Sequence, residues 1–256
     1  MKIKVGYLSE DDIENEAALL LSEYAETTGT PTKLPVPIDE ITTYHLALQL
    51  DFADLHEALH IPMLRDQPDI LGAIWVDTET ILIDRSLDPK KNPAMSGRYR
   101  FSVAHEIGHW RLHRSYVAKD AAQTSLFDGA SEPTVICRSS QAKEPIEWQA
   151  DFFSSCLLMP RRRVHKEWEQ CLGRTRPLLL SDLWPNGRVM MRAQTMIYEP
   201  GRSETGAVDD ALFEDVAKPI ARRFGVSAPA MRIRLEKLGL LLRQTPPQTS
   251  LRVSRP

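Results

Sequence analysis

The amino-acid sequence predicts an α+β fold with a small β-sheet. Residues 71–84 are rich in β-branched and aromatic side chains and indicate two strands. Residues 98–113 and 146–159, and a pair of segments near the C-terminus, have apolar residues every three or four positions, which is typical of helices. With 256 residues, 42% of them apolar and 26% charged, the chain has an ordinary globular composition. It is long enough for one large domain, or for a medium domain and a small module.

The N-terminal part predicts one long helix. Ser9 and the acids just after it indicate a helix start, because a serine caps free N–H groups and acids favour the positive end of the helix dipole. Gly29 and Pro31 indicate its end. The alternating stretch around residues 46–50 fits either a helix or a strand.

The middle of the chain predicts a hairpin followed by two helices. The strands at 71–84 lead through a polar loop to a helix from Arg98 to about His113. A loose stretch at 120–140 follows, and the second helix, Ile146–Met159, ends at a proline.

The C-terminal part predicts a separate helical module. Residues 211–224 and 228–241 form two helical patterns joined by Gly225, which is the outline of a helix-turn-helix. We therefore expect a main domain at 1–206 and a small helix-turn-helix-like module at 207–256. The structure of residues 161–206 is not evident from the sequence.

Charge is unevenly distributed along the chain. The net charge is −3, yet residues 216–256 hold nine basic residues and one acid, Glu236, a net +8 against −11 for residues 1–215. This asymmetry indicates either an appended module with an acidic partner or simply a solvated basic face. Direct DNA contact is one interpretation, but two helices lack the third that DNA-binding versions normally need. Packing on the main domain, or docking of a protein substrate, is the favoured interpretation.

The composition places the protein in the cytoplasm. No apolar run approaches the roughly 18 residues of a membrane-spanning helix, and the N-terminal residues turn acidic before a signal peptide could form. The three cysteines, at positions 137, 156 and 171, are an odd number at wide spacing, which is not a disulfide framework. Cys156 is expected to be a small core residue.

The helix at 98–113 carries a candidate metal site. His105 and His109 are four residues apart, so their side chains lie on one helix face and can meet one ion. Glu106 is placed to act as a general base on water at the metal. Gly108 is costly inside a helix, which predicts a close approach of substrate or of another element.

A catalytic zinc site needs a third protein ligand from elsewhere in the chain. Glu147 opens the second helix, and Asp151 follows on the same face, where it could hold the free N–H of a ligand histidine. Glu147 could also be an acid that merely favours the helix start. His113 lies roughly 12 Å of helix rise from His105, too far to share one ion, and is expected to be structural.

Substrate binding can be predicted only in outline. The hairpin at 71–84 could offer an edge strand to an extended substrate. Stabilising the developing oxyanion needs a further donor, for which Tyr99 and His165 are candidates.

Two motifs together resemble the ImmA/IrrE metallopeptidase family. They are RYRFSVAHEIGHWRLH at 98–113 and EWQADFFSSCLLMP at 147–160. The resemblance implies a zincin-like domain with Zn²⁺ held by His105, His109 and Glu147. It further implies that Glu106 is the base and that Asp151 supports a ligand, and it implies cleavage of a DNA-binding repressor, which releases stress-response or mobile-element genes.

Two other functions compete with peptidase activity. The chain could be a regulator with structural zinc that sequesters a repressor without cutting it. It could also be a DNA-binding regulator whose metallopeptidase domain only senses metal. Glu106 argues against the first of these, because an inert metal site has no use for a base.

Overall fold

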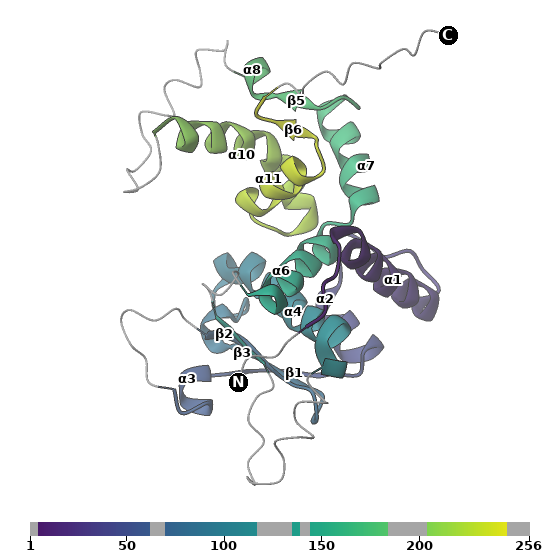
Figure 1. Ribbon diagram of the computed structural model, residues 1–256, viewed down its shortest axis with the longest axis vertical. Coiled ribbons are helices and arrows are strands. Elements are labelled where there is room, and N and C mark those ends of the chain that lie inside the picture. Colours follow the sequence, from purple (N-terminus) through teal and green to yellow (C-terminus); the bar gives the residue numbers. More distant parts are fainter. Residues whose placement is uncertain (1–4, 62–69, 117–134, 139–143, 184–203, 245–256) are drawn as a thin grey trace, which may run out of the picture. The chain divides into compact units, whose positions relative to one another are not determined.

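The computed structural model describes residues 5–61, 70–116, 135–138, 144–183 and 204–244, with 135–138 and 204–205 described by their backbone alone. The chain divides into two compact units. The first comprises Met1–Arg163 and Ala221–Ser227, and the second comprises Val164–Ile220 and Ala228–Pro256. Each unit is described by itself (Figure 1).

The long N-terminal helix α1, Glu10–Thr28, is capped at both ends. Ser9 accepts a hydrogen bond from the Asp12 N–H at 3.2 Å, and the Asp12 carboxylate accepts one from the Ser9 N–H at 3.0 Å. This reciprocal pair satisfies two N–H groups that the first turn leaves free. Gly29, at φ 66°, ends the helix in the left-handed conformation that glycine adopts without strain. Both predicted helix ends are confirmed.

Four strands form the sheet of the first unit in the order β1-β3-β2-β4. β2, Ile70–Trp75, and β3, Thr80–Asp84, are the predicted hairpin. β1, Gln49–Ala53, runs parallel to β3, so the ambiguous stretch near residue 50 leads into a strand. β4, Val135–Arg138, lies in the stretch predicted to be a loop.

The sheet order overturns one expectation about substrate binding. Both hairpin strands, β2 and β3, have a neighbour on each side, so neither offers a free edge. Within the described residues the edges of this sheet are β1 and β4. The hairpin pattern predicts pairing within the hairpin but not the strands that flank it, which come from distant parts of the chain.

Two central helices connect the sheet to α1. α4, Ser96–Gly108, contacts β2 and β3, and α6, Pro145–Leu158, contacts α4 and α1 (Figure 1). Their apolar faces are fully buried, with Val103 and Ile107 of α4 and Phe153 of α6 at 0% exposure. Burying one such side chain stabilises a fold by roughly 1.5–3 kcal/mol. The two helices that carry the candidate metal site therefore form the core of the unit.

Gly108 is required by the contact between α4 and α6. A Cβ atom at this position would lie 3.1 Å from the Cα of Ala150 and 3.2 Å from its carbonyl oxygen. Backbone atoms cannot move aside cheaply, so any larger residue would force the helices apart. The close approach predicted from Gly108 is made by a neighbouring helix.

The remaining elements of the first unit are short. They are α2 (Ile38–Glu40), η1 (Ile41–His45), α3 (Leu55–Ala58), η2 (Arg85–Leu87), η3 (Pro93–Met95) and η4 (His109–His113).

The second unit is mainly helical. Two of its helices are α10, Glu204–Phe224, whose last four residues belong to the first unit, and α11, Ala228–Lys237. They are the two predicted C-terminal helices with shifted ends. The other elements are α7 (Arg161–Leu172), which begins in the first unit, and β5 (Leu178–Leu179), α8 (Leu180–Leu183) and β6 (Leu241–Leu242).

Burial in α11 does not follow the polarity of its side chains. The helical pattern at 228–241 favours burial of apolar Ile233 and exposure of the arginines, yet Ile233 is 57% exposed, whereas Arg232 and Arg234 are 7% and 1% exposed. Arg232 is compensated by Glu236 at 2.6 Å and Asp210 at 3.3 Å. A buried charge with such partners cannot be recognised from helical periodicity.

The predicted α+β class is confirmed by the mixture of helices and small sheets. The two contact units divide the chain differently from the predicted domains, because residues 164–206 fall in the second unit. The domain boundary at 206/207 stays a prediction. None of the described helices is both long enough and apolar enough to cross a membrane.

Candidate metal centre

The H-E-x-x-H motif lies at the buried C-terminal end of α4. His105, Glu106 and His109 are at most 2% exposed. At His109 the α-helix changes to a single π-helical turn, η4, which ends at His113. Such turns are rare and occur often at functional sites.

Three side chains from two helices converge on one point. The Nε2 atom of His105 lies 3.2 Å from Glu147 Oε2, and that of His109 lies 3.6 Å from Glu147 Oε1. The two Nε2 atoms are 2.9 Å apart. One ligand atom from each residue lies within 4.8 Å of the others, a spacing that one metal ion can span. The structure thus brings together the three residues that the sequence proposes as ligands.

Asp151 orients the first histidine. Its Oδ1 atom lies 2.9 Å from Nδ1 of His105. A carboxylate can only accept, so Nδ1 carries the proton and Nε2 turns its lone pair toward Glu147 and His109. Asp151 therefore has the position predicted for it, behind a ligand and not at the metal.

The protonation states of the other two residues suit a cation. Burial lowers the pKa of His109 to about 4, so its imidazole is neutral. Burial acts to raise the pKa of Glu147, but its close polar contacts with the His105 and His109 imidazoles outweigh burial and lower that pKa to about 2. With the metal bound, the imidazoles of His105 and His109 would be neutral, and together with the Glu147 carboxylate they are a ligand set that zinc binds in catalytic sites.

Glu106 is buried without the polar contacts that the three proposed ligands make. It is 0% exposed, and neither of its carboxylate oxygens has a hydrogen-bond partner in the described part of the chain. Burial raises its pKa to about 8; the charge of His105 opposes this shift and that of Glu147 adds to it. In the metal-free chain this carboxyl group therefore keeps its proton at neutral pH, and the positive charge of a bound metal ion would favour the carboxylate form that a general base needs.

Gly72 of β2 makes room for the Glu106 carboxyl group. A Cβ atom at position 72 would lie 2.5 Å from Oε1 of Glu106 and 3.2 Å from its Cδ. Gly72 was not predicted as a site residue. A glycine inside an apolar strand was the available signal, because it often marks a close approach of another group.

We expect Gly72→Ala to displace Glu106 and to reduce hydrolysis while metal binding persists. The methyl group cannot fit without moving the carboxyl group, and such overpacking costs about 1–3 kcal/mol of stability. Gly97→Ala is the matched control, because its Cβ would lie 3.7 Å from the nearest non-local atom. Comparable hydrolysis rates in the two variants would contradict a positioning role for Gly72.

The raised pKa of Glu106 predicts a pH-dependent stability of the metal-free protein. The folded chain keeps a proton on Glu106 up to about pH 8, whereas an ordinary glutamate releases it near pH 4.5. The stability that this group contributes is thus fully present below about pH 4.5 and is lost as the pH rises through about 8. Glu106→Gln should therefore stabilise the metal-free chain more at about pH 8.5 than at about pH 5. Denaturant unfolding at both pH values tests this, and an equal difference at both would contradict it.

Of the two candidate oxyanion donors, one is engaged by another side chain and the other stays untested. The Tyr99 hydroxyl donates to Asp39 at 2.8 Å, which removes it as the expected oxyanion donor. His165 lies on α7 in the second unit, so its part of the expectation stays untested. Gln149, which lies 2.9 Å from His113, was not predicted as a site residue either.

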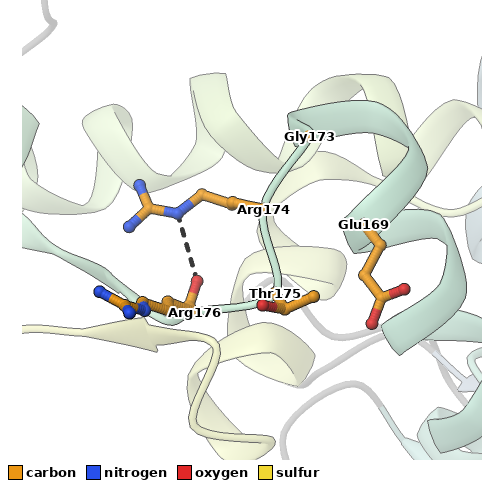
Figure 2. Close-up of a pocket in the computed structure, with 5 residues that line it drawn as sticks. All are labelled: Glu169, Gly173, Arg174, Thr175 and Arg176. Atoms are coloured by element: carbon orange, nitrogen blue, oxygen red, sulfur yellow. Dashed lines mark hydrogen bonds between the residues drawn. The ribbon is translucent and has the colours of Figure 1, made fainter.

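A pocket of about 640 Å³ lies in the second unit (Figure 2). Glu169 and the loop residues 173–176 line it. Arg174 donates through Nε to the carbonyl of Arg176 at 3.2 Å and through Nη2 to that of Pro177 at 2.9 Å. Its guanidinium thus supports the loop, and the lining offers no nucleophile or metal-ligand cluster. We assign no function to this pocket.

Comparison with known proteins identifies the domain that holds the metal centre. No curated protein sequence matches the chain. Among solved structures, a Mycobacterium tuberculosis transcriptional regulator is similar over 93% of this chain, with 16% identity and a TM-score of 0.43; this chain covers 59% of its length. Residues 66–176 match the family model Peptidase_M78, the IrrE N-terminal-like domain, and this segment contains all five proposed site residues. The match at residues 66–176 confirms the resemblance of the two helix motifs to ImmA/IrrE metallopeptidases.

Proposed function

We propose that this protein is a zinc-dependent endopeptidase. The observation that carries the proposal is the Glu106 carboxyl group, which is fully buried beside the three convergent ligands and has no hydrogen-bond partner in the described residues. Leaving such a group unsatisfied costs stability. A structural metal site gains nothing from it, whereas a hydrolase needs a base there.

The five site residues have three different roles in this reaction: binding the metal, orienting a ligand and transferring a proton. His105, His109 and Glu147 would hold the zinc ion, and Asp151 keeps His105 in the required tautomer. When bound, zinc supplies a Lewis acid for the scissile carbonyl group and for the attacking water. Glu106 takes the proton of that water and passes it to the leaving amine. Its apolar surroundings strengthen this proton transfer, because they leave the carboxylate poorly solvated.

The substrate that we propose is a DNA-binding transcriptional repressor of the helix-turn-helix class. The support is the likeness of the two helix motifs to ImmA/IrrE metallopeptidases. Cleavage would relieve repression of stress-response or mobile-element genes in the cytoplasm. The competing function is a non-catalytic regulator that holds its metal structurally and sequesters the repressor.

Comparison of protein N-termini tests this function. The parent protein and Glu106→Gln are expressed in matched cells, and new N-termini are identified by mass spectrometry. We expect a new N-terminus within a repressor in the parent cells only. If both proteins retain the repressor uncut on affinity purification, sequestration replaces cleavage as the function. If no N-terminus depends on the parent protein, peptidase activity in the cell is contradicted.

We propose that the C-terminal module either packs on the main domain or docks a protein substrate, and that it does not contact DNA directly. Two of its basic residues are engaged with acids: Arg232 with Asp210 and Glu236, and Arg243 with Glu236 at 2.7 Å. These guanidinium groups are therefore compensated within the unit. Binding of the full chain to duplex DNA at about 50 mM salt, falling steeply as salt is raised, would overturn this proposal.

A further inference from the structure

We propose that His113 and Gln149 are positioning residues that fix the tautomer of His109 and so aim its Nε2 lone pair at the metal. The inference rests on the metal site of the proposed function but not on peptide hydrolysis. It also gives a role to the N-terminal segment, whose Gly6 carbonyl group ends the chain of hydrogen bonds described next.

Three contacts connect His109 to the N-terminal segment. Nδ1 of His109 lies 3.1 Å from Nδ1 of His113. Nε2 of His113 lies 2.9 Å from Oε1 of Gln149, and Nε2 of Gln149 donates to the carbonyl oxygen of Gly6 at 2.9 Å. The three side chains are at most 2% exposed. The series therefore runs through the protein interior, with little access to competing water.

The direction of every proton in this series follows from its last member. The Gly6 carbonyl oxygen can only accept, so the Gln149 amide must point its NH₂ group at Gly6 and its oxygen at His113. That oxygen accepts the Nε2–H of His113, which leaves Nδ1 of His113 with a lone pair. His109 then donates its Nδ1–H to this lone pair, and its Nε2 atom is left as the acceptor.

The result is the tautomer that metal binding requires. The His109 Nε2 atom is the one that faces Glu147 and His105. His109 thus has through His113 the kind of support that His105 has from Asp151. His105 donates its Nδ1–H to the carboxylate of Asp151. His109 donates its Nδ1–H to the neutral imidazole of His113, which the Gln149 amide orients. Removing partners of this kind typically lowers metal affinity 10–100-fold.

The π-helical turn η4 places His113 for this role. His109 and His113 open and close the turn, and their ring centroids are 5.2 Å apart. The four-residue spacing that continues from His105 and His109 is therefore meaningful, although His113 is not a ligand. It supports the ligand that precedes it on the same helix face.

Matched substitutions separate positioning from plain packing. His113→Gln keeps an acceptor for His109 and a donor for Gln149, whereas His113→Leu removes both. Gln149→Leu acts one step further from the metal. Ser154→Ala is the control, because it removes a buried hydrogen bond of α6, from Ser154 Oγ to the Ala150 carbonyl at 2.7 Å, outside the series. Zinc affinity is measured by competition with a chelator, and Co²⁺ spectra report the ligand geometry.

We expect His113→Leu and Gln149→Leu to lower zinc affinity about 10–100-fold, with His113→Gln and Ser154→Ala close to the parent protein. Equal affinities in folded His113→Leu and His113→Gln would overturn the proposal. The parent protein offers a test without substitution: imidazole ¹⁵N spectra should show the proton of His109 on Nδ1. A proton on Nε2 in the metal-free chain would overturn the proposal even if a variant fails to fold.

Discussion

Glu106→Gln should abolish hydrolysis and leave the metal in place. Glutamine keeps the size of the side chain but cannot take a proton from water, and loss of a general base lowers rates by about 10²–10⁴-fold. His105, His109 and Glu147 are unchanged, so zinc content should stay at one ion per chain. Rates on the repressor identified by N-terminal mapping, measured together with zinc content, test this expectation.

The control for this substitution is Glu57→Gln, because the Glu57 side chain is 82% exposed and far in sequence from the motif. It should cleave at the rate of the parent protein. Cleavage by Glu106→Gln at that same rate would show that another group is the base. Loss of zinc from Glu106→Gln would show instead that the residue supports the metal.

His109→Ala should remove zinc altogether. Two ligands remain, His105 and Glu147, and three protein ligands are the usual minimum for a catalytic zinc site. We expect zinc content to fall from one ion per chain to a trace after dialysis, and hydrolysis to fall with it. Inductively coupled plasma mass spectrometry of purified protein gives the metal content directly.

His165→Ala is the matched histidine control, since His165 is exposed on α7. It should bind zinc as the parent protein does. Full occupancy in His109→Ala would contradict the ligand set. A partial loss with a changed Co²⁺ spectrum would indicate that a neighbouring side chain replaces His109, and the assignment of this ligand would then fail.

Local signals in the sequence predicted much of the fold. The Ser9 cap, the Gly29 end and the hairpin at 71–84 are made by neighbours in sequence, and all three are confirmed. The H-E-x-x-H spacing and the downstream Glu147 likewise predicted which side chains meet. These features depend on helix geometry and on residue chemistry, and both can be predicted from a single sequence.

The features that the sequence did not predict depend on contacts between distant residues. Gln149 and Gly6, which form a hydrogen bond, are 143 positions apart in the sequence. Gly72 of β2 lies against the side chain of Glu106 of α4. The buried Arg234 contradicts the helical pattern around it, because its surroundings and not its neighbours in sequence decide its burial. The support of His105 by Asp151 could thus be predicted from a motif, whereas the support of His109 and the space for Glu106 depend on the folded chain.

The contact at Gly108 also determines how this protein should respond to a chelator. Backbone atoms of α4 and α6 meet there through Ala150, and apolar side chains on both sides hold the two helices together. None of these contacts depends on a metal ion. The two helices are therefore already ordered, and the chain loses little conformational entropy when an ion binds. A zinc finger unfolds when its metal is withdrawn, since the ion supplies its folding energy. Here the metal should leave and return reversibly, with the helices already in register to receive it.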